Sequence, residues 1–246
     1  MKKNNSMRAA GGLMIATMLT TSIVSGTYAK YVTSDSATDT ARVAKFGVLV
    51  EADGSLFGKN YLAAADNTPT DDTTGITVKS LSNPADNVVA PGTKNDEGLS
   101  FSITGTPEVD VEIKINVLNT PTDVFLLNGT YPDMTTTSDS DEFTLNTPYY
   151  PIKYTLTKQD GTTVEGNLET IVGELNNKKE IYKAGENLSG SLGNFTLTWE
   201  WAFEQDQDQA DTLLGDLAAG TVTGIDAANY NLNTNIELTV SVTQVD

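Results

Sequence analysis

The chain of 246 residues contains no histidine and no cysteine. Without histidine it lacks the commonest general base and zinc ligand, and it can form neither a Ser-His nor a Cys-His nucleophile pair. Without cysteine it has no disulfide, so its stability has to come from a hydrophobic core, from assembly or from metal. The spacing of the carboxylates nominates no catalytic pair. We therefore predict that the protein is not an enzyme.

Basic residues are also scarce, with 15 Lys and Arg against 33 Asp and Glu, and the formal net charge is −18. A surface of this sign repels nucleic acid and anionic lipid headgroups. We expect no nucleic-acid partner, and no motif in the chain indicates a cofactor.

The one long apolar run, residues 13–24, follows a basic N-terminus and precedes Thr27-Tyr28-Ala29, which has the small-x-small character of a signal cleavage site. The run is shorter than the roughly 20 residues that cross a bilayer. We predict that residues 1–29 are a secretory signal peptide and that cleavage falls between Ala29 and Lys30. The chain would then be secreted and have no membrane anchor.

What the chain has in abundance is alternation of apolar and polar residues with a period of two, which is typical of half-buried strands. Such strands pack as an antiparallel β-sandwich, because each has one wet face. We predict a polar arm over 30–45 and one all-β sandwich domain over 46–246. The clearest strands are 109–117, 152–156, 195–203 and 236–242, and shorter candidates are 46–50, 76–81, 99–104 and 123–127.

Turn and capping residues punctuate these strands. Asp160-Gly161 predicts a hairpin turn between 154 and 164. Asn167 is placed to cap a short helix over 168–175, and Asp211 to cap a second one over 212–219 that Gly220 ends. No βαβ rhythm connects these helices, so we expect short helical insertions between strands. Polar loops are expected at 63–75 and 134–141.

An acidic segment, EQDQDQAD, contains four carboxylates that could surround a hard cation such as calcium. It lacks the glycine and the bidentate glutamate of an EF-hand loop. Its other interpretation is a solvated acidic loop, and we assign no metal site. The four residues are Glu204, Asp206, Asp208 and Asp211.

Two tryptophans, Trp199 and Trp201, fall on one face of the strand over 195–203. Exposed aromatic rings on a sandwich can stack on sugars, whereas buried ones form the interior, and the second interpretation is the more common. A monomeric binding module for glycan or calcium is therefore the alternative function.

The chain contains the leader with TYAKYVTS, then the blocks ARVAKFGV, APGTKNDEGLSFSITGTPEVDVEI, TLTWEWAFEQDQDQADTLLG and the final VTQVD. These blocks resemble the TasA and camelysin family, the secreted matrix-fibre subunits of Gram-positive bacteria, which implies a location in the extracellular matrix or at the cell surface. The resemblance implies a jelly-roll-like sandwich and biofilm-matrix filaments in which the N-terminal strand of one subunit completes the sheet of the next. Camelysin-like relatives have been labelled metalloproteases, but a chain without histidine cannot carry a His-Glu-x-x-His zinc site.

Strand donation also has a physical basis in this sequence. An open sandwich has edges with unpaired backbone groups, and an arm that leads into a strand can pair with such an edge on another copy. Donor and acceptor differ, so the contact is head-to-tail and propagates. We predict a homopolymer, with other matrix proteins as further partners, and the alternative is a first strand that pairs within its own subunit. The predicted donor residues are Val43, Phe46, Val48 and Val50.

Overall fold

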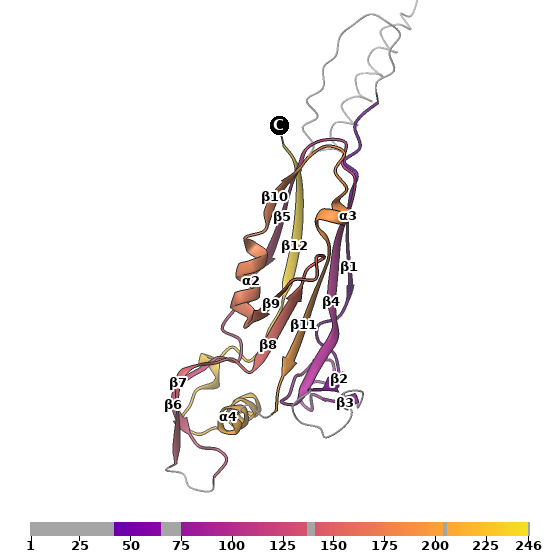
Figure 1. Ribbon diagram of the computed structural model, residues 1–246. Coiled ribbons are helices and arrows are strands. Elements are labelled where there is room, and N and C mark those ends of the chain that lie inside the picture. Colours follow the sequence, from indigo (N-terminus) through magenta and orange to yellow (C-terminus); the bar gives the residue numbers. More distant parts are fainter. Residues whose placement is uncertain (1–41, 65–74, 137–140, 204–205, 246) are drawn as a thin grey trace, which may run out of the picture.

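The computed structural model describes residues 42–64, 75–136, 141–203 and 206–245 (Figure 1). The expected signal peptide, the bond between Ala29 and Lys30 and most of the predicted arm over 30–45 lie outside these residues.

The larger of two main sheets is antiparallel and has seven strands. Its long central strand, β4 (Thr93–Gly105), pairs with other strands along both of its edges and runs along the long direction of the molecule (Figure 1). In spatial order the strands are β3 (Gly75–Thr77), β2 (Asn60–Ala63), β4, β11 (Gly193–Trp201), β8 (Ile152–Thr157) and β9 (Thr163–Gly166), and β1 (Val48–Gly54) also pairs with β4.

The smaller main sheet is antiparallel, and a separate two-stranded sheet and the short helices accompany it. Its order is β10 (Lys179–Tyr182), β5 (Val111–Leu118) and β12 (Glu237–Gln244). The two-stranded sheet consists of β6 (Leu127–Pro132) and β7 (Glu142–Tyr149). The helices are α2 (Leu168–Asn176), α3 (Leu188–Ser191), α4 (Asp208–Ala219) and the 3-10 turn η1 (Ala227–Asn229).

Alternate residues of the long strands point into one shared core. In β5 the buried residues are every second one from Val111 to Val117, and in β11 they run the same way from Gly193 to Trp201. Both sets belong to a single hydrophobic cluster, so the two main sheets face each other across it. The prediction of an all-β fold with antiparallel sheets and short helical insertions is confirmed.

The expected hairpin and both helices are present. Asp160 and Gly161 form the turn between β8 and β9, with Gly161 at a φ of 79°. The Asn167 side chain caps α2 by accepting a hydrogen bond from the Thr170 N–H at 3.0 Å. The second helix, α4, begins at Asp208 and not after Asp211, while Gly220 ends it in the left-handed conformation as expected. No helix in the described residues has the length and apolar character needed to cross a bilayer.

Three of the expected strand assignments are wrong. The segment predicted as 76–81 pairs only as far as Thr77, and Leu81 is 96% exposed. Over 123–127, Val124 makes one isolated bridge and the strand itself starts at Leu127. β11 ends at Trp201, so Phe203 leaves the inward face that its spacing predicted and is 52% exposed.

Candidate assembly site

The first strand, β1, lies on an edge of the larger sheet. It pairs with the second half of β4 in antiparallel register, from Val48 opposite Gly105 to Gly54 opposite Leu99. The first half of that same side of β4 is occupied by β2, and β11 covers the other side. β1 therefore extends an edge of the sheet and has no second strand partner among the described residues.

Side chains contribute little to the attachment of β1. Phe46 and Val48 are partly buried and pack against the core. From Leu49 to Gly54 every residue is exposed, including Leu49 at 53% and Val50 at 41%. Backbone hydrogen bonds, which carry no sequence information, thus hold most of this strand to β4.

An ion pair anchors the segment that leads into β1. The Arg42 guanidinium donates two hydrogen bonds to the Glu108 carboxylate, each at 2.5 Å. The backbone N–H of Lys45 donates a third to the same carboxylate at 2.8 Å. The hydrogen bonds from Arg42 and then from Lys45 lower the pKa of Glu108 to about 2. The Glu108 carboxylate therefore stays charged at mildly acidic pH. The ion pair with Arg42 persists over the same range.

Close backbone contacts set the register at the two ends of the ladder. Gly54 and Gly98 approach so closely that a side chain on Gly54 would clash with the carbonyl oxygen of Gly98. At the other end Gly105 meets the carbonyl of Gly47 in the same way. All four glycines have positive φ, which other residues rarely adopt. A strand pairing here must therefore present glycine at these two positions.

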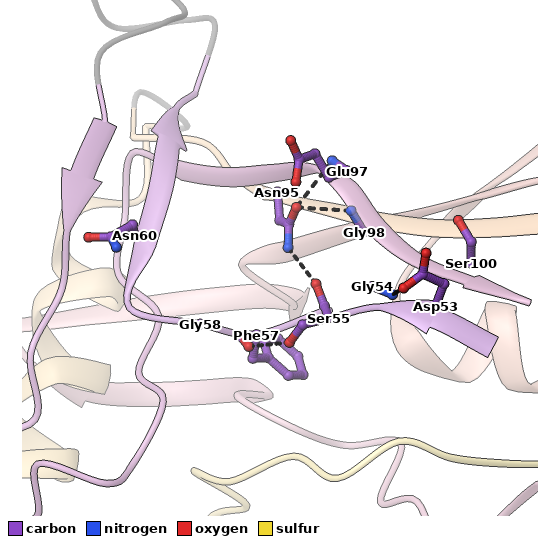
Figure 2. A pocket seen from close by; sticks show the side chains of 10 residues that line it. All are labelled: Asp53, Gly54, Ser55, Phe57, Gly58, Asn60, Asn95, Glu97, Gly98 and Ser100. Atoms are coloured by element: carbon purple, nitrogen blue, oxygen red, sulfur yellow. Dashed lines mark hydrogen bonds between the residues drawn. The ribbon is translucent and has the colours of Figure 1, made fainter.

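Two side chains of the larger sheet hold the turn between β1 and β2, and Figure 2 shows the first of them, Asn95. The Asn95 amide donates to the carbonyl oxygens of Ser55 and Leu56 at 2.8 and 3.0 Å, and its oxygen accepts from the N–H groups of Glu97 and Gly98. Trp199 Nε1–H donates to the Leu56 carbonyl at 2.6 Å. We call residues 55–58 the hinge, because they lie between β1 and β2.

A pocket of about 420 Å³ lies beside the hinge, between the end of β1 and a bulge in β4. The register shows the bulge: Leu197 of β11 is opposite Leu99, but Trp199, two residues later, is opposite Asn95. Two acidic residues, Asp53 and Glu97, are among the lining residues that Figure 2 labels. Its lining is mostly polar.

The structure places the predicted donor residues in two different environments. Val43 is 82% exposed and precedes β1, while Phe46 and Val48 pack against the core and Val50 is exposed within β1. In the single chain β1 pairs with β4 of the same subunit. This is the alternative that the sequence left open.

The described part of the acidic segment, residues 206–211, forms no cluster of metal-ligating side chains. No group of three or more acidic side chains among the described residues could hold a metal ion. Glu204 lies outside those residues. Asp211 instead turns inward, where its Oδ1 accepts hydrogen bonds from the Tyr149 hydroxyl at 2.7 Å and from Trp201 Nε1–H at 3.2 Å. The interpretation of this residue as part of a solvated loop is wrong.

The two tryptophans belong to the core. Trp199 and Trp201 are buried, and the Tyr61 ring meets Trp199 edge-on at 4.9 Å between centroids. A flat aromatic platform for a sugar is therefore absent from this face of β11, and the core interpretation is confirmed.

Sequence reasoning missed the residues that hold β1 in place. Arg42 and Glu108 are separated by 66 positions, so no local pattern joins them. Asn95 could have been suspected, because Asn-Asp-Glu-Gly within a strand pattern is typical of a bulge.

Comparison with protein-family models, with curated proteins and with solved structures finds no match to this chain.

Proposed function

We propose that this chain is a secreted, non-enzymatic structural subunit that polymerises into extracellular filaments, with each copy exchanging its β1 with the next. The observation that carries the proposal is the way β1 is attached: an edge ladder of backbone hydrogen bonds, with the side chains of residues 49–54 exposed. Because the ladder joins backbone groups, β1 of an identical copy can form it in the same register.

The closed subunit and the exchanged filament would contain the same ladder. Their difference in free energy is therefore small, and it depends on the hinge and on protein concentration. When β1 leaves β4, the backbone hydrogen bonds between the two strands and the ion pair between Arg42 and Glu108 all break. Opening is therefore the slow step. Once β1 has left, residues 99–105 of β4 become the acceptor edge for the next copy. Donor and acceptor differ, so growth is head-to-tail and does not close.

The secreted location rests on the leader over 1–29, and the matrix role rests on the resemblance to the TasA and camelysin family. A jelly-roll-like connectivity belongs to the same proposal, and the two sheets that share one core support it. Other matrix proteins would bind the filament through the same exposed strand, β1.

A pair of cysteines across the ladder tests the exchange. Glu51 and Ser102 are register partners, and the natural chain has no cysteine that could interfere. In the double variant Glu51→Cys/Ser102→Cys, oxidation of the monomer before assembly locks β1 onto its own β4. We expect electron microscopy to show no filaments until a reductant is added. Oxidation after assembly should instead link neighbouring copies, which a non-reducing gel shows as a ladder of covalent multimers.

The matched control is Thr155→Cys/Glu165→Cys, which joins register partners in the hairpin of β8 and β9. Its disulfide should leave filament formation unchanged and should never link copies. The proposal is wrong if locked monomers form filaments as readily as reduced ones, or if the unmodified chain without residues 1–29 forms none at any concentration.

A further inference from the structure

A second pocket, of about 480 Å³, opens at the opposite end of β11 from α3, where the strand meets α4. One wall is the helix face that carries Leu214, Gly215 and Ala218. The other walls are Trp201 at the end of β11, the ring of Phe125, and the segments 86–91 and 232–234. The ring of Phe57 also lines it, so this pocket shares one hinge residue with the first. It is the more apolar of the two pockets described here.

The position of Phe125 is imposed by its neighbours. The residue has a φ of 57°, which is a strained conformation for a bulky side chain. Its backbone N–H donates to the Asn231 carbonyl at 2.8 Å, and Val124 forms a parallel bridge with the same residue. The ring centroid of Phe125 thereby comes within 5.9 Å of that of Trp201. Two aromatic rings from distant parts of the chain are thus held together at the pocket.

The charged residues that line the pocket are all acidic. They are Asp211, from α4, and Asp86, from the loop before β4, and no lysine or arginine lines the pocket. The two hydrogen bonds to Asp211 described above both end on its Oδ1. Thr234 is also among the lining residues, and its Oγ1 is buried without a hydrogen-bond partner in the described residues. Such an oxygen is costly to leave unsatisfied.

We propose that this pocket binds an organic cation, an ammonium group on an apolar stem, such as a free alkylamine or the side chain of a lysine. The aromatic and aliphatic walls suit the stem, and the faces of aromatic rings also attract the cation. The carboxylate of Asp211 accepts a hydrogen bond from the ammonium group, and Asp86 on the facing loop adds a second negative charge. An anion would be repelled, and a bare metal ion would find too few oxygen ligands.

The same carboxylate makes the binding depend on pH. Burial raises the pKa of Asp211 to about 6, against the hydrogen bonds from Tyr149 and Trp201, and the charge of Asp208 on the same helix raises it further. Asp86 is the acidic group on the facing loop. A cation favours the charged form of Asp211, so affinity should be highest above pH 6 and fall about tenfold for each pH unit below it.

Tryptophan fluorescence provides the measurement. The chain has two tryptophans, and only Trp201 lines the pocket. Titration at pH 7.5 with n-butylammonium chloride should give a saturable change in emission. The isosteric neutral n-butanol and sodium chloride should give none at the same concentrations. A parallel titration with Nα-acetyl-lysine amide, which carries the same ammonium group on a peptide unit, distinguishes a polypeptide source of the cation from a free amine.

Two variants test the site without threatening the fold. Gly215 lies in α4, and a Cβ added there meets nothing within 4 Å, so Gly215→Leu fills the pocket while it favours the helix. Asp211→Asn removes the charge and keeps an oxygen for Tyr149 and Trp201. Each should weaken butylammonium binding at least about tenfold. Asp216→Asn, on the same helix but outside the pocket, should bind as the natural chain does.

The proposal is overturned if n-butanol binds as well as n-butylammonium, or if Gly215→Leu leaves the titration unchanged. It is equally overturned if neither cation changes the emission of the natural chain. None of these outcomes depends on whether the chain forms filaments.

Discussion

Arg42 and Glu108 form a bidentate ion pair that connects the segment before β1 to the loop after β4, with both N–O distances at 2.5 Å. Arg42 is thus held at the far end of the ladder from the hinge. The pair thus adds a second attachment, beside the backbone ladder, at the start of β1.

The first prediction concerns this attachment. Glu108→Gln replaces the charged acceptor with a neutral amide, so β1 should open more often. Hydrogen exchange of the amides at 48–54 should be faster than in the natural chain, by less than about fivefold because the pair is exposed to solvent. Glu112→Gln, which removes a comparable surface pair with Lys179 on the smaller sheet, should leave the exchange of β1 unchanged.

The second prediction is the pH range in which the pair stabilises the protein. The pKa of Glu108 is lowered from 4.5 to about 2 in the folded chain, so its contribution is complete above pH 4.5 and is lost as the pH falls towards 2. The difference in melting temperature between the natural chain and Glu108→Gln should therefore persist from pH 7 to 5 and vanish near pH 2. A difference that disappears already at pH 6 would contradict it.

The third prediction concerns the hinge. Asn95→Ala removes two hydrogen bonds to the carbonyls of Ser55 and Leu56 and two from the N–H groups at 97 and 98. We expect the free energy of unfolding in urea to fall by about 1–3 kcal/mol, because partly buried polar groups lose their partners. Asn60→Ala, which removes one exposed hydrogen bond with Thr77, should stay within about 0.5 kcal/mol of the natural chain.

The fourth prediction compares two glycines. Gly98 has a φ of 63°, and a Cβ there would collide with the Leu197 carbonyl. Gly98→Ala should lower the free energy of unfolding by at least about 1–3 kcal/mol. Gly173 lies inside α2 with open space around it, so Gly173→Ala should raise the free energy of unfolding by about 0.5–1 kcal/mol. Equal effects of the two substitutions in a urea titration would show that the bulge in β4 is not constrained.

The fifth prediction is the sign of a pH effect at Asp211. Burial raises the pKa of its carboxyl from 3.8 to about 6 in the folded chain. The folded state then binds more protons than the unfolded state between these two values, so this residue makes the protein less stable as the pH rises from 4 to 6. Asp211→Asn should remove that decline. Melting temperatures of the two proteins should diverge as the pH rises through this range and run parallel above pH 7.

Regular alternation made four of the strands predictable. In β5 the apolar residues from Val111 to Val117 are buried and the polar ones between them are not, as the period of two requires. Local chemistry likewise predicted the turn at Asp160-Gly161 and the Asn167 cap of α2, because each depends on residues within four positions.

Strands without such alternation were not predictable in the same way. β10 has the sequence KEIY, and its Ile181 is 56% exposed while Tyr182 is buried. The first half of β4, TKNDEG, reads as a turn, yet it pairs with β11 around a bulge. In both cases a neighbouring strand supplies the hydrogen bonds, and the local residues do not reveal that neighbour.

The amino-acid sequence by itself determined the class of the fold, the hairpin of β8 and β9 and the placement of Trp199 and Trp201 in the interior, since these follow from periodicity and from residues close together in the chain. Only the tertiary structure decided that β1 lies on β4, that Arg42 meets Glu108, and that Asp211 turns inward beside Trp201. These relationships depend on which distant segments become neighbours in the sheets. That choice is made by the packing of the whole core, and no short stretch of residues contains it.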